Sequence, residues 1–299
     1  MIVITGATGN TGSVAAEALL AKGHQVRVIG RSADKLKRFT AKGAEAFVGD
    51  VLDVPAMARA FAGATAIYAM IPPDLTQADF PGYQARVADS LALAIEQAGV
   101  RYVVSLSSVG AQVAAGAGPI SGLGWFEQRL NRVAGLNVLH LRPAFFFENF
   151  LMQIPAIQNS GIMGGSLRAD VSLPMIATRD IGECAAEALG KLDFQGQQTR
   201  ELLGPRDLTL REAAAILGQA IGRTLSYVQL PYEELEATLV QMGFSRSGAQ
   251  ALTEMYRGIN EGTVRGQEPR SPENTTPTTL ESFAATEFAP RFQGRAASA

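Results

Sequence analysis

The first twelve residues of the chain decide the fold: Met1-Ile2-Val3-Ile4-Thr5-Gly6-Ala7-Thr8-Gly9-Asn10-Thr11-Gly12. A short apolar run meets glycines spaced three apart, and a helical pattern follows with Val14, Ala15, Ala18 and Leu19 on one face. In such a unit Gly6 allows the tight exit from the strand, Gly9 lets the backbone approach a diphosphate, and Gly12 lets the helix pack on the sheet. The stretch therefore predicts a dinucleotide site, and its alternative is a purely structural strand-turn-helix.

The same loop offers hydrogen-bond donors to phosphate groups. A helix N-terminus presents free N–H groups and the positive end of the helix dipole. Thr8, Asn10 and Thr11 can add side-chain donors.

Composition limits the class of protein. A chain of 299 residues can hold one large α/β domain, alone or with a smaller appendage. The formal net charge of −2 lacks the basic excess of a nucleic-acid-binding surface, so no direct contact with nucleic acid is expected. No run approaches the roughly 18 apolar residues of a membrane span, so no membrane association is expected. One cysteine and two histidines cannot build an ordinary zinc site, so no metal is expected.

The cellular compartment is predicted to be the cytoplasm. The first expected strand begins at Met1, which leaves no room for a signal peptide. The single cysteine, Cys184, cannot form an internal disulfide and fits a reducing compartment. Because Cys184 falls in an apolar helical stretch, we interpret it as a buried, inert thiol.

Strands and helices alternate over residues 1–150. After the first unit we expect strands at 25–29, 46–48, 66–71, 102–106 and 138–141, with helices at 32–42, after Asp53 and at 84–98. Asp53 is expected to be an N-cap, with Pro55 in the first turn of its helix. The alternation predicts parallel βαβ units with right-handed crossovers. The fold class is therefore α/β, a doubly wound Rossmann-type parallel sheet that binds NAD(P) within residues 1–150.

Residues 151–299 are expected to form a smaller, mostly helical lobe on the substrate side, contiguous with the core. Asp180 with Glu183, and Thr209 with Glu212, have the spacing of capping boxes. A further helical stretch is expected from 232 to about 259, and Thr278 with Glu281 is expected to open a last short helix. Residues 294–299 are expected to be frayed.

The end of the second strand favours NADP(H) over NAD(H). An acidic residue there would bind the ribose 2′-hydroxyl of NAD, but this chain has Gly30-Arg31, with Lys35 one helical turn later. Arg31 supplies a planar fork for phosphate oxygens. The alternative is a solvated basic surface that also includes Lys37 and Arg38. Asp50, after the third strand, is placed to accept from the adenine amino group, and its alternative is a turn residue.

Several motifs along the chain resemble the NmrA-like proteins, which are atypical members of the short-chain dehydrogenase/reductase superfamily. They are the Gly6–Gly12 loop, Gly49-Asp50, Ser107-Ser108, Thr178-Arg179-Asp180-Ile181 and Leu141-Arg142-Pro143-Ala144-Phe145-Phe146-Phe147-Glu148-Asn149. The resemblance implies a Rossmann core, NAD(P) bound across the strand ends and a small C-terminal lobe over the nicotinamide. Taken with the loop, it predicts the following cofactor-binding residues: Gly6, Thr8, Gly9, Asn10, Thr11, Gly12, Arg31, Lys35, Asp50, Val51, Ile71, Pro72, Ser107, Pro143, Ala144 and Phe145.

The catalytic pair of ordinary short-chain dehydrogenases is missing from the sequence. They use a Tyr with a Lys four residues later, where the Lys lowers the Tyr pKa. Here Leu123 and Glu127 stand at those positions, no tyrosine occurs between Tyr102 and Tyr227, and no lysine between Lys42 and Lys191. We interpret Glu127 as structural rather than as a general base.

Two serines after the fifth strand are the catalytic candidates. Ser107 and Ser108 can each hydrogen-bond a substrate oxygen, or simply satisfy a strand-end carbonyl. His140 lies inside an apolar strand and is interpreted as a satisfied core histidine.

Without a positioned acid, hydride transfer to a simple ketone is disfavoured, because the developing alkoxide needs a proton or an oxyanion hole. A quinone or conjugated dye gives a delocalised product that water protonates afterwards, so it needs mainly stacking surface and proximity. Predicted substrate-binding residues are Tyr83, Trp125, Phe146, Phe147 and Met152, and their alternative is core packing.

The sequence thus leads to the hypothesis of an NADPH-dependent reductase of a quinone-like or conjugated aromatic acceptor. This resembles the quinone-oxidoreductase and dye-reductase branch of the family. The alternative is a non-enzymatic NADP(H) sensor that acts through a protein partner. A reductase or isomerase of the isoflavone-reductase type would need a lysine near residues 117–131, where there is none.

Overall fold

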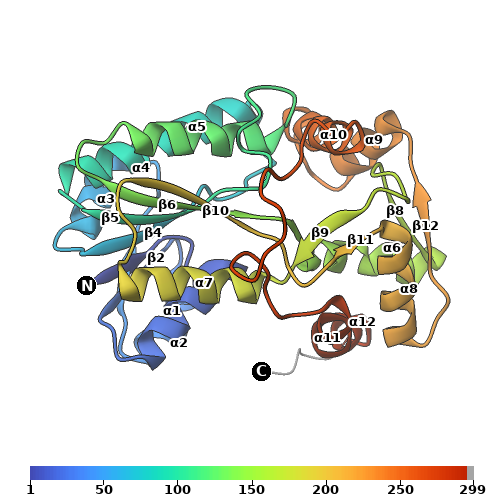
Figure 1. Cartoon of the computed structure of the whole chain (residues 1–299), viewed down its shortest axis with the longest axis horizontal. Helices are drawn as coiled ribbons and strands as arrows, with labels where there is room; N and C mark the ends of the chain where they lie inside the picture. The colour runs from blue at the N-terminus through green and yellow to red at the C-terminus, as the bar shows by residue number, and fades with distance from the viewer. Residues whose placement is uncertain (295–299) are drawn as a thin grey trace.

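The computed structural model describes residues 1–294, and the expectation of a frayed end for 295–299 lies outside the described residues (Figure 1). Its largest sheet has seven strands in the order β10-β6-β5-β4-β1-β2-β3, and all neighbouring strands are parallel. These strands are β1 (Ile2–Ile4), β2 (Val26–Gly30), β3 (Glu45–Val48), β4 (Ala66–Ala69), β5 (Tyr102–Leu106), β6 (Asn137–Pro143) and β10 (Gln197–Leu202). The predicted α/β, doubly wound Rossmann-type sheet is confirmed.

Helices cover both faces of this sheet, as Figure 1 shows. One face carries α1 (Asn10–Ala21), α2 (Ala33–Thr40) and α7 (Thr178–Lys191), whose apolar side chains share one core cluster. The other carries α3 (Val54–Phe61), α4 (Phe80–Gln97) and α5 (Pro119–Asn131), which share a second cluster. Because both faces are buried, the inner strands are apolar runs rather than alternating patterns.

The strand order reverses beside β1, which pairs with β2 on one side and with β4 on the other. In open α/β sheets this switch point leaves a crevice at the carboxyl ends of the strands. The glycine loop follows β1 directly, so it lies at this crevice.

Two elements of the Rossmann layer come from beyond residue 150. Strand β10 pairs with β6 over six positions, and α7 packs on α1. The expected boundary at residue 150 therefore needs a correction, since residues 178–202 return to the sheet after a detour through the second lobe. The sequence pattern missed this strand because Gln197-Gln198-Thr199-Arg200 is exposed and polar at the edge of the sheet.

The second lobe is mostly helical, as expected, and it also holds two small sheets. The strands of these sheets are β7 (Phe145–Phe146), β8 (Ile162–Gly165), β9 (Leu173–Ile176), β11 (Asp207–Leu208) and β12 (Ser226–Gln229). Its helices are η1 (Phe147–Gln153), α6 (Ile154–Ser160), α8 (Leu210–Ile221), α9 (Tyr232–Gln241), α10 (Arg246–Asn260), α11 (Leu280–Phe283), η2 (Ala284–Phe288) and α12 (Ala289–Phe292). None of the helices in residues 1–294 combines the length and the hydropathy that a membrane crossing requires.

The structure contains some of the helix caps that the sequence predicts and lacks others. Asp53 accepts from the N–H of Ala56, and Thr209 forms the expected capping box with Glu212. The stretch 232–259 is two helices instead of one, because Gly243 has a φ of +96° and Ser245 caps a new start. The last helical segment is capped by Thr279 rather than Thr278, since the Thr278 side chain is engaged elsewhere.

Candidate functional site

The glycine loop and α1 are in close backbone contact. Gly6 has a φ of +61°, a conformation that side-chain-bearing residues rarely adopt. A Cβ on Gly12 would lie 2.5 Å from the carbonyl oxygen of Gly6, whereas one on Gly9 would lie 3.3 Å from it. Gly9 is the N-cap of α1, so the first turn of the helix presents its free N–H groups at the crevice.

The three side chains expected to help with phosphates differ in accessibility. Thr8 and Asn10 are exposed at the loop. Thr11 is buried, and its hydroxyl oxygen accepts a hydrogen bond of 2.9 Å from the Tyr68 hydroxyl. Thr11 therefore holds the loop to the floor of the site, while Thr8 and Asn10 face outward.

A first cavity of about 180 Å³ opens between the glycine loop and the ends of β2 and β3. It is lined by Gly6, Thr8, Ile29, Gly30, Arg31, Gly49, Asp50, Val51, Leu52, Pro72, Asp74, Gln77 and Tyr83. It thus brings together six of the predicted cofactor residues from four separate segments. Lys35 and Ile71 are not among the lining residues; Lys35 is exposed on α2 and Ile71 is buried in the core.

Several polar side chains that line this cavity form hydrogen bonds with neighbouring residues. Asp50 accepts from the backbone N–H of Leu52 through one carboxylate oxygen. The Thr76 and Gln77 side chains donate to Asp74 and lower its pKa, an effect to which the nearby Arg31 charge adds. The Tyr83 hydroxyl donates to the Pro72 carbonyl at 3.1 Å, and burial raises the pKa of Tyr83. Tyr83, a predicted substrate-binding residue, lines the same cavity as Arg31 and Asp50.

A second cavity, of about 300 Å³, lies on another side of the same loop. Its lining residues are Thr8, Gly9, Asn10, Ser13, Val14, Arg38, Glu148, Ala177, Thr178, Arg179, Thr278, Phe283, Thr286, Glu287 and Arg291. Thr8 borders both cavities. The sequence pattern assigned Arg38 only to a solvated surface and gave no signal for Arg291.

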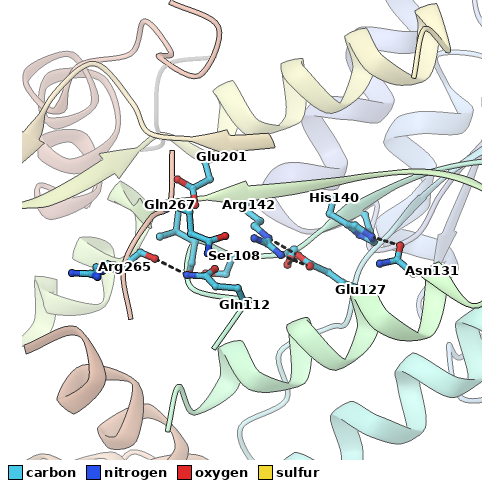
Figure 2. Close-up of polar contacts among 12 residues, drawn as sticks. Ser108, Gln112, Glu127, Asn131, His140, Arg142, Glu201, Arg265 and Gln267 are labelled. Atoms are coloured by element: carbon cyan, nitrogen blue, oxygen red, sulfur yellow. Dashed lines mark hydrogen bonds and ion pairs between the residues drawn. The ribbon is translucent and has the colours of Figure 1, made fainter. Parts of the chain in front are cut away.

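A buried cluster of polar side chains lies at the ends of β5 and β6 (Figure 2). Ser107 donates from Oγ to Glu127 Oε1 at 2.5 Å. Arg142 binds both carboxylate oxygens of Glu127, from Nε at 2.8 Å and from Nη2 at 2.6 Å. All three residues are at most 9% exposed, and the Glu127 carboxylate raises the pKa of Arg142.

The structure shows what Leu123 and Glu127 do at the positions where ordinary short-chain dehydrogenases have the Tyr and the Lys. Glu127 holds Arg142 and Ser107 together, and Leu123 packs against the apolar core. The other serine, Ser108, donates to the carbonyl of Val109 at 2.9 Å. Neither cavity described above includes Ser107 or Ser108.

Glu201 extends the cluster towards the C-terminal part of the chain. It lies in register with Arg142 across β6 and β10, is 1% exposed, and accepts from the backbone N–H groups of Gln267 and Glu268. Gln112 donates to the carbonyl of Arg265 at 2.9 Å (Figure 2). The segment 265–268 is therefore held against the strand ends, and no motif in the sequence pointed to Glu201.

His140 is a core histidine, as expected. Its Nδ1 lies 2.6 Å from Ser105 Oγ and its Nε2 lies 3.0 Å from Asn131 Oδ1. The side chain is 1% exposed, and burial lowers its pKa to about 4. His140 is thus neutral near pH 7 and has both ring nitrogens satisfied.

A sequence profile now places the chain among known proteins. The profile of the NmrA-like family matches residues 1–286. The chain belongs to the NmrA-like family. It is 28% identical over 260 residues to the NAD(P)H azoreductase of Xenophilus azovorans, a match that covers 86% of each chain. It is 25% identical over 269 residues to quinone oxidoreductase 2 of Escherichia coli, covering 88% of this chain and 89% of the relative.

Solved structures show the same fold. The NADPH-dependent quinone oxidoreductase of Escherichia coli, complexed with NADPH, superposes with a TM-score of 0.82 at 24% identity and covers 96% of this chain and all of its own. The triphenylmethane reductase of a Citrobacter species, complexed with NADP(H), gives a TM-score of 0.77 at 20% identity, with 96% and 99% covered.

The segment ending in Glu148-Asn149, the most discriminating part of the resemblance to NmrA-like proteins, caps α7. Both carboxylate oxygens of Glu148 accept from the Thr178 N–H, at 3.0 and 3.1 Å, and Oε1 also accepts from the Thr178 hydroxyl at 2.6 Å. Burial raises the pKa of Glu148. The expected capping role of Asp180 is wrong, because α7 begins at Thr178 and the buried Asp180 carboxylate accepts from Thr278 instead.

The predicted substrate-binding residues of this NmrA-like chain do not gather around one cavity. Phe147 is buried against Phe283, with ring centroids 5.6 Å apart, so it is a core residue. Phe146 is half-buried in β7. Trp125 and Met152 are 43% and 52% exposed and line neither cavity. Of the remaining cofactor residues, Pro143 and Ala144 are buried at the end of β6, and Phe145 packs on Phe150.

Proposed function

We propose that this chain is an NADPH-dependent reductase that passes hydride to a quinone-like or conjugated aromatic acceptor without a Tyr and Lys pair. The observation that carries the proposal is the first cavity, where Arg31 and Asp50 meet the glycine loop at the carboxyl ends of the strands. Arg31 stands where an NAD-specific site would have a carboxylate, and a guanidinium suits a 2′-phosphate.

The residues present fit a dinucleotide. The first cavity would hold the adenosine, with Arg31 on the 2′-phosphate and Asp50 near the adenine amino group. Gly9, the N-cap of α1, carries no side chain where a diphosphate would bind, and Gly12 lets α1 pack closely on the Gly6 backbone. Lys35, Ile71, Ser107 and the segment 143–145 remain proposed contacts around the strand ends. When bound, NADPH supplies a hydride.

The proposed class of acceptor is based on the hydrogen bonds that Ser107 and its neighbours already make. The Ser107 proton is used on Glu127, and the Glu127 carboxylate is held by Arg142. No group of this cluster is free to protonate an alkoxide as it forms. A quinone or cationic dye avoids this need, because its reduced form is delocalised and water protonates it afterwards. Ser108 and Phe146 are our proposed substrate contacts.

The relatives support the same class of reaction. By their names, the azoreductase uses NAD(P)H, and the quinone oxidoreductase and the dye reductase were crystallised with NADPH or NADP(H). The acceptor of this chain and its cytoplasmic location stay predictions.

The test is NADPH oxidation, followed by absorbance, with a panel of quinones, azo dyes and cationic triarylmethane dyes. We expect turnover with at least one acceptor, slower turnover with NADH, and loss of the NADPH preference in Arg31→Ala. A matched control is Lys37→Ala, an exposed residue of α2 that pairs only with Asp34 among the described residues. Absence of oxidation above background with every acceptor would sink the proposal.

A non-enzymatic NADP(H) sensor is the second candidate. It is favoured by the full engagement of Ser107 and Glu127, and by the fact that neither described cavity reaches them. A sensor would bind NADPH, would not oxidise it with any acceptor of the panel, and would bind a protein partner in a manner that depends on the cofactor.

A further inference from the structure

The second cavity is lined by three arginines from segments far apart in the sequence. Arg38 comes from α2, Arg179 from α7 and Arg291 from α12, and all line one space with Thr8, Gly9 and Asn10 of the glycine loop. Two carboxylates also line it, but Glu148 is already bound to Thr178. The cavity therefore joins a surplus of guanidinium groups to the N-terminal turn of α1.

The C-terminal segment is held firmly over this cavity. Thr278 donates from its N–H and its hydroxyl to the buried Asp180 carboxylate, and Arg179 Nε donates to Thr278 Oγ1. Phe283 packs on Phe147 within the third apolar cluster. A π-helical turn, 284–288, follows, and such turns occur frequently at functional sites. Arg291 is thus presented by a fixed element.

Two of the arginines have only weak partners. Arg38 lies over the Phe39 ring at 4.5 Å and makes no ion pair with any other residue of 1–294. Arg291 pairs with Glu287 at 2.8 Å in a half-exposed contact of the i, i+4 type. Exposed pairs of this kind contribute little, so a phosphate group could displace Glu287 from Arg291 at small cost.

We propose that Arg38 and Arg291 bind the diphosphate of the dinucleotide from the wall facing the glycine loop, so that the C-terminal segment 278–291 is part of the cofactor site. The proposal rests on the proposed function only in taking the ligand to be a dinucleotide. Thr8, which borders both cavities, marks where the adenosine side meets the diphosphate side. Arginine is suited to this task because its planar fork binds phosphate oxygens in pairs.

Titration of NADPH and of NADH by calorimetry tests the proposal. Both cofactors carry the diphosphate, and only NADPH carries the 2′-phosphate. We expect the double variant Arg38→Ala, Arg291→Ala to weaken both by the same factor, about tenfold or more. Arg31→Ala should weaken NADPH alone. Glu287→Gln should tighten both several-fold, because it frees Arg291 from its carboxylate.

Controls separate binding from folding. Lys191→Ala removes a comparable i, i+4 pair with Glu187 at the far end of α7 and should leave both affinities unchanged. Arg291→Lys should recover part of the affinity, and all variants should keep the wild-type Tm. Amide hydrogen exchange over 280–292 should slow on addition of either cofactor.

Two results would overturn the inference: unchanged affinity for both cofactors in the double variant, or weakening of NADPH alone, which would assign Arg38 to the 2′-phosphate. Binding of neither cofactor by the wild type would overturn the inference together with the proposed function.

Discussion

The two ends of the strand crevice are built in opposite ways. At the nucleotide end, Arg31 and Asp50 are exposed side chains on short segments that follow β2 and β3. At the other end, Ser107, Glu127 and Arg142 are buried and come from three separate elements. Exposed groups are free to bind a ligand, whereas buried charges must satisfy one another. Changes at the first end should therefore alter affinity, and changes at the second should alter stability.

The largest effect is expected from Glu127→Gln. It leaves the buried Arg142 charge without its carboxylate and weakens the Ser107 hydrogen bond. We expect a loss of about 4 kcal/mol in the free energy of unfolding, measured by urea denaturation. The control Asp34→Asn breaks an exposed pair with Lys37 and should cost no more than about 0.5 kcal/mol. A cost below about 1 kcal/mol for Glu127→Gln would mean that the buried cluster is not structural.

His140 gives a pH-dependent effect at the same end. Its pKa is lowered from 6.5 to about 4 in the folded state, so the unfolded chain binds the extra proton between these values. The neutral form of His140 therefore contributes about 3 kcal/mol to the free energy of unfolding. This contribution is fully present above about pH 6.5 and is lost as the pH falls towards 4. Unfolding of the wild type and of His140→Gln between pH 7.5 and 4.5 measures the difference. Parallel curves would contradict the lowered pKa.

At the nucleotide end, Gly12→Ala should have a smaller effect on stability and a clear one on binding. The new Cβ would meet the Gly6 carbonyl oxygen at 2.5 Å, so backbone must shift, at a cost of about 2 kcal/mol. Cofactor affinity should fall because the loop and the first turn of α1 move together. Gly9→Ala, with its contact at 3.3 Å, is the milder control for stability, although its Cβ would still hinder the approach of a diphosphate. Equal losses of stability in the two variants would show that close packing at Gly12 is unimportant.

Arg31→Ala should cause the smallest change in free energy, and it should change the affinity for NADPH alone. We expect a loss of about 1.4 kcal/mol, or tenfold, in NADPH affinity, with NADH affinity and Tm unchanged. Fluorescence titration of both cofactors measures this, with Lys37→Ala as the control. If wild type binds NADH and NADPH equally, Arg31 does not recognise the 2′-phosphate.

The nucleotide end could be predicted from the sequence because its signals are local. Gly6, Gly9 and Gly12 are fixed by backbone geometry within one strand-turn-helix unit, and Arg31 follows β2 directly. The alternation of strands and helices likewise predicted the sheet up to β6.

The buried cluster and the second cavity could not be predicted, because their contacts join distant segments. Glu201 accepts from the backbone of Gln267 and Glu268 more than sixty residues away, and Arg291 lines one cavity with the glycine loop from the other end of the chain. Strand β10 was missed because its exposed start carries no apolar pattern. The burial of the aromatic residues was not predicted either. Trp125 is exposed and Phe147 is buried, and residue type alone does not say which face of an element a side chain lies on.

Direct evidence for the central claim would come from NADPH labelled with deuterium at nicotinamide C4, incubated with the protein and a cationic triarylmethane dye. We predict that deuterium appears on the central carbon of the reduced dye, detected by mass spectrometry, and that a quinone is reduced in a parallel reaction. Binding of NADPH without deuterium transfer to the dye and without quinone reduction would contradict the reductase and leave the sensor.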